Sequence, residues 1–364
     1  MQRWAEVGGS PVTAATASAA DTIRWGSGDE HARTDWSVVT QVRPLGDDAV
    51  VFVGARHDRE PEVIRWRSGE EPDVLVAARD LGLDSSFFAE PTHVTFETSG
   101  GETAHALYYP PANPDHTAPD GELPPILVKA HGGPTAAARP QLQLSHRYWT
   151  SRGFGLVDVD YRGSIGYGRT YRHSLRGRWG VADVDDCIAA VEHLVDQGLA
   201  DPARAAIAGG SAGGFTVLAA LEAGDVFSAG ASRYGVADLE VLATDTHKFE
   251  ARYLDRLVGE WPADKSTYVE RSPIHHTDRL SCPMILLQGG EDKVVPPNQA
   301  ELMIEALDAA GLPYAYVLFP DEGHGFRNAD NIVVALESEL SFFAQTFGFE
   351  PADDIEPITI ANLA

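Results

Sequence analysis

The sequence has little cysteine and little lysine. Only two cysteines, Cys187 and Cys282, occur among 364 residues. Nothing therefore indicates a disulfide framework, and two free thiols in a reducing cytoplasm are the simpler interpretation. Lysine occurs four times against 24 arginines, a bias to which we attach no functional meaning.

Long apolar runs are also absent. No uninterrupted stretch approaches the ~20 residues that a membrane-spanning helix needs. The first 20 residues lack both a basic region and an unbroken apolar core, so we see no signal peptide and expect a cytoplasmic protein. Acidic residues outnumber basic ones 54 to 28, for a net charge of −26. That excess argues against nucleic acid or an anionic membrane as partner.

Residues 1–84 are predicted to be a short β-rich piece. Turn-forming segments separate four β-prone runs, at 36–42, 49–53, 62–66 and 73–77. Four short strands in about 40 residues is the size of one β-propeller blade, although a free-standing four-stranded sheet fits equally well. Residues 1–30 are rich in Ala, Gly, Ser and Thr, and the sequence does not place them.

Residues 85–350 alternate strands and helices, which is typical of a mostly parallel sheet flanked by helices. Strands are expected at 93–97, 105–109, 125–130, 155–160, 205–208, 229–234, 283–288 and 315–319. Helices are expected at 140–152, 183–197, 212–223, 297–310 and 330–346. The remaining residues, 351–364, have no obvious partner, and we expect a loose tail.

The strongest chemical signal is Gly209-Gly210-Ser211-Ala212-Gly213, between an apolar run and a helix-forming run. A strand that reverses into a helix within a few residues lifts the Ser211 hydroxyl clear of the sheet, as in a nucleophile elbow. A plain tight turn and a dinucleotide phosphate cradle are the alternatives. The cradle needs an acidic residue ending the next strand, whereas Asp225 precedes that strand.

Three further loops could complete an acyl-transfer site. After the strand at 125–130, the backbone N–H of Gly133 could stabilise an oxyanion together with that of Ala212, although a plain turn is the alternative. After the strand at 283–288 come two rival acids, Glu291 and Asp292. After the last strand, His324 stands between two glycines and could take the serine proton. The order Ser, Asp, His is that of α/β-hydrolases.

Six segments, in order, resemble the prolyl oligopeptidase superfamily of serine peptidases, and most closely its acylaminoacyl-peptidase and dipeptidyl-peptidase branch. They are His-Gly-Gly-Pro at 131–134, Asp-Tyr-Arg-Gly-Ser-Ile-Gly-Tyr-Gly at 160–168, Trp-Gly-Val-Ala-Asp-Val-Asp-Asp at 179–186, Gly-Gly-Ser-Ala-Gly-Gly at 209–214, Asp-Lys-Val-Val-Pro at 292–296 and Gly-His-Gly-Phe at 323–326. The resemblance covers about residues 85–348 and implies an α/β-hydrolase fold.

The resemblance also assigns roles. It implies Ser211 as nucleophile, His324 as base and Asp292, rather than Glu291, as the acid that orients His324. It implies oxyanion donors on Gly133 and Ala212, and it places Tyr234 in the substrate pocket. No cofactor or metal is expected.

The chain departs from the family at the front. Family members carry a complete propeller, which needs about 4 to 8 blades, and 84 residues hold roughly one blade. We expect either a truncated or remnant form, or a second chain that completes the stack. An apolar face made by Val39, Val51, Val53 and Ile64 would then need cover, so we predict a homo-oligomer through residues 36–78. The alternative is an open monomer whose active-site mouth admits larger peptides.

The predicted function is a serine hydrolase acting on short peptides or N-acylated amino acids through an acyl-enzyme on Ser211. A carboxylesterase is the alternative among enzymes, because the same three residues cleave esters more readily than amides. A non-catalytic binding protein that keeps the fold is the alternative from another class.

Overall fold

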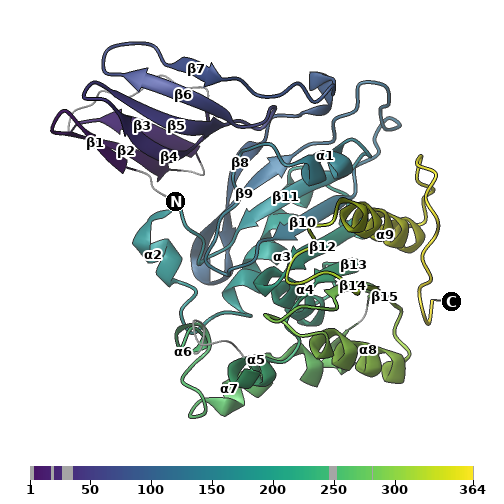
Figure 1. Cartoon of the computed structure of the whole chain (residues 1–364). Helices are drawn as coiled ribbons and strands as arrows, with labels where there is room; N and C mark the ends of the chain where they lie inside the picture. The colour runs from purple at the N-terminus through teal and green to yellow at the C-terminus, as the bar shows by residue number, and fades with distance from the viewer. Residues whose placement is uncertain (1–3, 18–19, 27–35, 246–251, 281, 364) are drawn as a thin grey trace.

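The computed structural model describes residues 4–17, 20–26, 36–245, 252–280 and 282–363. Two small antiparallel sheets from the N-terminal part of the chain stand beside a larger α/β unit (Figure 1). All strands of the small sheets fall within residues 1–84, and all strands of the large sheet fall within residues 85–350.

The α/β unit is built on one sheet of eight strands, ordered β15-β14-β13-β12-β10-β11-β9-β8. Its strands are β8 Thr92–Thr98, β9 Glu102–Tyr109, β10 Ile126–Ala130, β11 Gly155–Asp160, β12 Ala205–Gly210, β13 Ala229–Arg233, β14 Met284–Gly289 and β15 Tyr314–Phe319. Neighbours from β11 to β15 pair in parallel, whereas β9 pairs antiparallel with both β8 and β11. The expected α/β-hydrolase fold with eight strands is confirmed.

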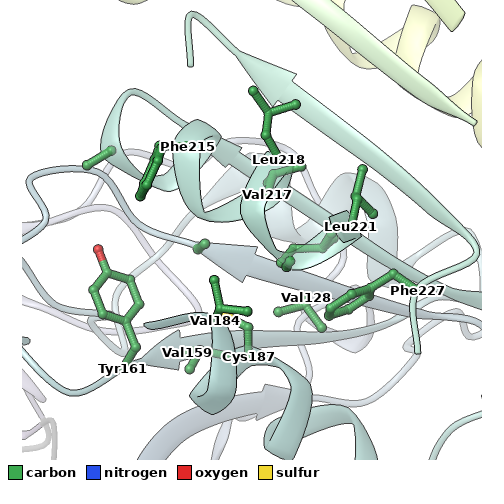
Figure 2. Close-up of a cluster of buried hydrophobic side chains, with 14 of the residues drawn as sticks. Val128, Val159, Tyr161, Val184, Cys187, Phe215, Val217, Leu218, Leu221 and Phe227 are labelled. Atoms are coloured by element: carbon green, nitrogen blue, oxygen red, sulfur yellow. The ribbon is translucent and has the colours of Figure 1, made fainter. Parts of the chain in front are cut away.

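Helices cover both faces of this sheet, so the central strands β10 to β14 are buried on both sides. Side chains alternate along β10, so that Val128 joins the core under α3 (Ala182–Asp196) and α4 (Ala212–Ala223), while Leu127 joins the core under α1 (Leu144–Thr150) and α9 (Ala329–Phe347). Figure 2 shows part of the first core, which contains Val128 of β10, Val184 and Cys187 of α3, and Leu218 of α4.

All five expected helices form: α1, α3, α4 and α9, given above, and α8 (Asn298–Ala310). Four short helices were not expected. They are α2 Gly168–His173, α5 Leu239–Asp245, α6 Leu254–Leu257 and α7 Lys265–Arg271. In the described part of the chain, every helix is too short or too polar to cross a membrane.

The four strands expected between residues 36 and 77 form an antiparallel sheet in sequence order: β4 Val38–Leu45, β5 Ala49–Ala55, β6 Glu62–Arg67 and β7 Asp73–Val76. A second sheet precedes it, made of β1 Trp4–Val7, β2 Ser10–Ala17 and β3 Ala20–Trp25. The two sheets share one core, in which Val12 and Ile23 of the first sheet contact the second sheet's apolar face.

The prediction of a single apolar face was therefore wrong. Phe52 pairs with Ile64 across β5 and β6, and Val53 pairs with Val63. Successive side chains of a strand point to opposite faces, so Val51 and Val53 lie on the face opposite to Ile64. Val39 and Ile64 are fully buried against β1–β3.

Contacts join the small sheets to the segment that follows β10. The Arg139 guanidinium donates to the Asp21 carboxylate at 2.6 Å, and the Ser37 hydroxyl donates to the Pro140 carbonyl at 2.5 Å. The Leu142 N–H donates to the Arg56 carbonyl at 2.6 Å. The small sheets thus hold the segment just downstream of residues 131–134.

The expected loose tail is instead bound to the α/β unit. Tyr314 of β15 and Ala361 exchange two backbone hydrogen bonds, of 3.1 and 2.8 Å. The Ile358 N–H donates to the Ser341 hydroxyl of α9 at 2.9 Å. The end of the chain, shown in yellow in Figure 1, therefore runs along the outer edge of the large sheet.

Candidate active site

The turn between β12 and α4 consists of a single residue, Ser211. Its backbone has φ 57° and ψ −121°, which is strained for a residue with a side chain. A Cβ on Gly209 would lie 2.5 Å from the Gly213 carbonyl oxygen, and one on Gly213 would lie 2.1 Å from the Ala130 carbonyl oxygen. Both glycines are therefore required for the helix to begin so close to the strand.

The structure brings together the three residues that the sequence placed beyond separate strands. Ser211 Oγ lies 2.9 Å from His324 Nε2. His324 Nδ1 lies 2.8 Å from Asp292 Oδ2. These two hydrogen bonds link β12, β15 and β14 through the loops at their carboxyl ends, where parallel strands present side chains together.

The two rival acids are clearly separated. The Asp292 side chain is fully buried, and its Oδ1 accepts hydrogen bonds from the N–H groups of Val294 at 2.8 Å and Val295 at 2.9 Å. Glu291, by contrast, is exposed. Only Asp292 of the two reaches His324, with one oxygen held by the backbone and the other facing the imidazole.

The loop of residues 131–134 lies against Ser211. A Cβ on Gly132 would be 3.5 Å from Ser211 Cβ and 3.1 Å from the Gly210 carbonyl oxygen. Gly133 has φ 129°, which glycine adopts without strain. Ala212 is the first residue of α4, so its N–H lies at the positive end of that helix with no partner required within it. Ala212 thus follows Ser211 in the sequence, and Gly133 follows Gly132, the glycine that lies against Ser211.

Tyr234, the predicted pocket residue, lies beside the histidine. Its φ is 39°, and its N–H donates to the Leu287 carbonyl at 2.7 Å. Its ring packs edge-on against His324 at 4.9 Å between centroids and against Phe326 at 5.3 Å. Phe326 is an addition to the site, and its position two residues beyond His324 was the available signal.

A second residue not predicted is Glu322, which is buried between the two loops. Its carboxylate accepts from the N–H groups of Arg327 and Asn328 and from the Asn331 side chain, and these hydrogen bonds, led by that of Asn331, lower its pKa. Its carbonyl accepts from the Glu291 N–H at 2.9 Å. Glu322 therefore ties the loop of the histidine to that of the acid. No sequence signal distinguished it from its neighbour Asp321.

Within the described ranges, no group of three or more histidine, cysteine, aspartate and glutamate side chains is arranged to hold a metal ion. The site histidines have protein partners. His324 is held as above, and His131 Nε2 lies 2.7 Å from the Ser164 hydroxyl.

Comparison with known proteins identifies a family that is similar to the segment carrying Ser211, Asp292 and His324. The profile of the prolyl oligopeptidase family matches residues 140–350. Dipeptidyl aminopeptidase BIII of Pseudoxanthomonas mexicana is 32% identical over 230 residues, which cover 62% of this chain and 33% of that protein. The acylamino-acid-releasing enzyme of Arabidopsis thaliana is 32% identical over 213 residues, covering 56% of this chain and 28% of the relative.

Among solved structures, a puromycin-hydrolysing peptidase of Mycobacterium tuberculosis is 42% identical, with a TM-score of 0.93. The match covers 99% of this chain and 55% of that one. The chain thus spans about a third of the length of the curated relatives and just over half of this structural neighbour.

Proposed function

The chain belongs to the prolyl oligopeptidase family, and from this premise we propose that it is a serine hydrolase that cleaves short peptides or N-acylated amino acids. The observation that carries the proposal is the continuous line of hydrogen bonds from Ser211 through His324 to Asp292. In a hydrolase each of these groups has a defined part in moving one proton.

In the proposed reaction, Ser211 Oγ attacks the substrate carbonyl carbon while its proton passes to His324 Nε2. Asp292 accepts a hydrogen bond from His324 Nδ1–H, which keeps Nε2 free to accept the proton. The negative charge of Asp292 also stabilises the imidazolium that forms. The C–N bond then breaks, the leaving amine takes the proton from Nε2, and an acyl-enzyme remains on Ser211. A water molecule then attacks the acyl carbon while His324 Nε2 takes its proton. The ester bond to Ser211 breaks, Ser211 Oγ takes the proton back from His324, and the carboxylic acid is released.

The developing oxyanion needs two fixed donors. We assign them to the N–H groups of Gly133 and Ala212, because the loop of residues 131–134 lies against Ser211 and Ala212 begins α4. Tyr234 and Phe326 form an aromatic wall beside His324. That wall supports a hydrophobic side chain on the acyl side of the scissile bond.

The relatives support an amide as the scissile bond. A dipeptidyl aminopeptidase, an acylamino-acid-releasing enzyme and a puromycin-hydrolysing peptidase are all similar to this chain. The test is to compare kcat/KM for aminoacyl p-nitroanilides, acyl-aminoacyl p-nitroanilides, puromycin and p-nitrophenyl esters, using the chain and its Ser211→Ala variant.

Amide turnover that disappears in Ser211→Ala supports the proposal, and the preference between free and acylated amino ends identifies the substrate class. Cleavage of esters alone would refute the peptidase proposal in favour of a carboxylesterase. Equal rates in the two proteins on every substrate would favour a binding protein with the hydrolase fold.

A further inference from the structure

Four exposed arginines gather on the segment after β11 and on α6, and we call them the basic patch: Arg169, Arg172, Arg176 and Arg256. The first three recur every three or four residues along α2 and the turns that continue it, so they lie on one side of that segment. The Gly177 N–H donates to the Arg256 carbonyl at 3.0 Å, which holds α6 against the same turns. Partial burial and the positive charges of all four arginines lower the pKa of His173, so all four lie near this one ring.

The patch arginines lack acidic partners. Within the described part of the chain, no carboxylate lies within ion-pair distance of any of the four. Arg176 instead donates to His173 Nε2 at 3.1 Å, and Asp255, the neighbour of Arg256 in the sequence, pairs with Arg252 at 3.0 Å. Acidic residues outnumber basic ones 54 to 28 in this chain, so the shortage of acids is local to the patch.

The basic patch lies at the edge of the large sheet that carries the proposed catalytic residues. α2 follows the carboxyl end of β11 and α6 follows that of β13, while Ser211 follows β12. Parallel strands present such segments at one edge. The Ile165 N–H donates to the Ala136 carbonyl at 2.8 Å, and the Tyr253 hydroxyl donates to the Gly133 carbonyl at 3.2 Å. Both patch segments therefore contact the loop after β10, beside the proposed active site (Figure 1).

We propose that the basic patch binds carboxylates of the substrate, so that the chain prefers acidic peptides. The inference rests on the proposed function and narrows its substrate class. Arginine suits this role because its planar guanidinium donates two parallel hydrogen bonds to a carboxylate. An extended peptide advances about 3.3–3.6 Å per residue. The carboxylates that meet the patch therefore belong to residues several positions from the bond that Ser211 attacks.

The charge of the rest of the chain favours a short peptide over a larger polyanion. With a net charge of −26, the chain as a whole repels negatively charged partners. A nucleic acid or an anionic membrane extends well beyond four arginines and would meet this excess, whereas a short peptide touches the patch alone. Charges elsewhere on the surface affect the peptide less, because the Debye length is about 8 Å at physiological ionic strength.

Pairs of internally quenched peptides test the proposal. Each pair extends the best amide substrate by Glu-Glu or by Gln-Gln, at the amino end in one pair and at an amidated carboxyl end in the other. The patch variant removes three positive charges through Arg169→Gln, Arg172→Gln and Arg176→Gln. The control variant removes the same charge from exposed arginines outside the patch, through Arg24→Gln, Arg43→Gln and Arg279→Gln.

In at least one pair, we expect kcat/KM for the Glu-Glu peptide to exceed that for the Gln-Gln peptide by about 3- to 30-fold at low salt, because several modest ion pairs form together. The ratio should fall close to one in 1 M NaCl, where the Debye length is about 3 Å. It should also fall close to one in the patch variant at low salt, whereas the control variant should keep it. Because each ratio compares two peptides on one protein, a general loss of activity in a variant cancels.

A ratio near one for both pairs in the unmodified chain, or a ratio that the patch variant keeps, would overturn the inference. If the patch variant keeps the ratio but has a smaller mass by light scattering, the patch instead binds a second copy of the chain. If the three changes together prevent folding, Arg172→Gln alone should lower the ratio by about 1.5- to 5-fold, and an unchanged ratio there contradicts the proposal.

Failure of the proposed function would look different, because neither kind of peptide would then be cleaved in a way that depends on Ser211. Binding of the same peptides to Ser211→Ala, measured by fluorescence anisotropy, still tests the patch in that case. Tighter binding of the Glu-Glu peptide, lost when the patch changes are added, supports the inference, and equal binding of the two peptides contradicts it.

Discussion

Replacing Asp292 by Asn should disable the proposed base without disturbing the fold. The backbone N–H groups of Val294 and Val295 both donate to Asp292 Oδ1. In the variant these two donors require the amide oxygen at the same position. The amide NH2 must then face His324 Nδ1, where Oδ2 now lies 2.8 Å away.

An NH2 group facing Nδ1 forces that nitrogen to be an acceptor, so the imidazole proton moves to Nε2. Nε2–H then faces Ser211 and cannot take its proton. The loss of this tautomer costs about 10⁴ in kcat in enzymes of this type, which corresponds to about 5.4 kcal/mol of transition-state stabilisation. Because two backbone N–H groups hold the amide oxygen, the side chain in Asp292→Asn cannot rotate to exchange its oxygen and nitrogen. We therefore expect the full loss of kcat.

The assay is kcat at pH 7 on the best substrate, with Glu291→Gln as the matched control. Glu291 is the neighbouring carboxylate and is exposed, so its loss should leave kcat within about twofold of the unmodified chain. Near-normal kcat in Asp292→Asn, or a large loss in Glu291→Gln, would refute this account of the acid.

Three further predictions concern stability and assembly. Gly213→Ala should lower the free energy of unfolding, measured in urea, by at least about 1–3 kcal/mol, because its Cβ would lie 2.1 Å from the Ala130 carbonyl oxygen. Gly224→Ala is the control and should lower it far less, because nothing lies within 4 Å of its Cβ. Equal losses in the two variants would contradict this reasoning. Burial raises the pKa of Glu222 to about 8, so the folded protein loses stability as the pH rises from about 4.5 to about 8. Glu222→Gln should therefore raise the urea midpoint at pH 8.5 but hardly at pH 5. An equal shift at both pH values would contradict this prediction. We also propose that the chain self-associates through β7, whose Val74, Leu75 and Val76 are 46–57% exposed. Light scattering should then give a smaller assembly mass for Val76→Lys than for the unmodified chain. A monomeric mass for the unmodified chain would exclude the proposal.

The central strands of the large sheet, β10 to β14, could be predicted because they are buried on both faces and are short apolar runs between turn signals. Their boundaries differ from the expected ones by a few residues at most. The site residues were predictable for a related reason. In a parallel sheet, residues just beyond different strands meet at one edge, so Ser211, Asp292 and His324 could be sought there without knowing any distance.

The features that the sequence did not predict depend on contacts with another part of the chain. Residues 4–25 contain few strong apolar residues, and one face of their strands is buried because β4–β6 present a complementary face. The run at residues 50–53 is apolar throughout, so alternation could not say which side chains faced inward until the register of β5 with β6 was known. The tail is held by backbone groups of β15, which no composition reports.

The most direct test of the central claim is covalent labelling with a fluorophosphonate probe at pH 7, followed by mass analysis of the peptide that contains Ser211. The account predicts one label per chain, on Ser211, absent from Ser211→Ala and strongly slowed in Asp292→Asn. No label on the unmodified chain, or equal labelling of the unmodified chain and Ser211→Ala, would contradict it.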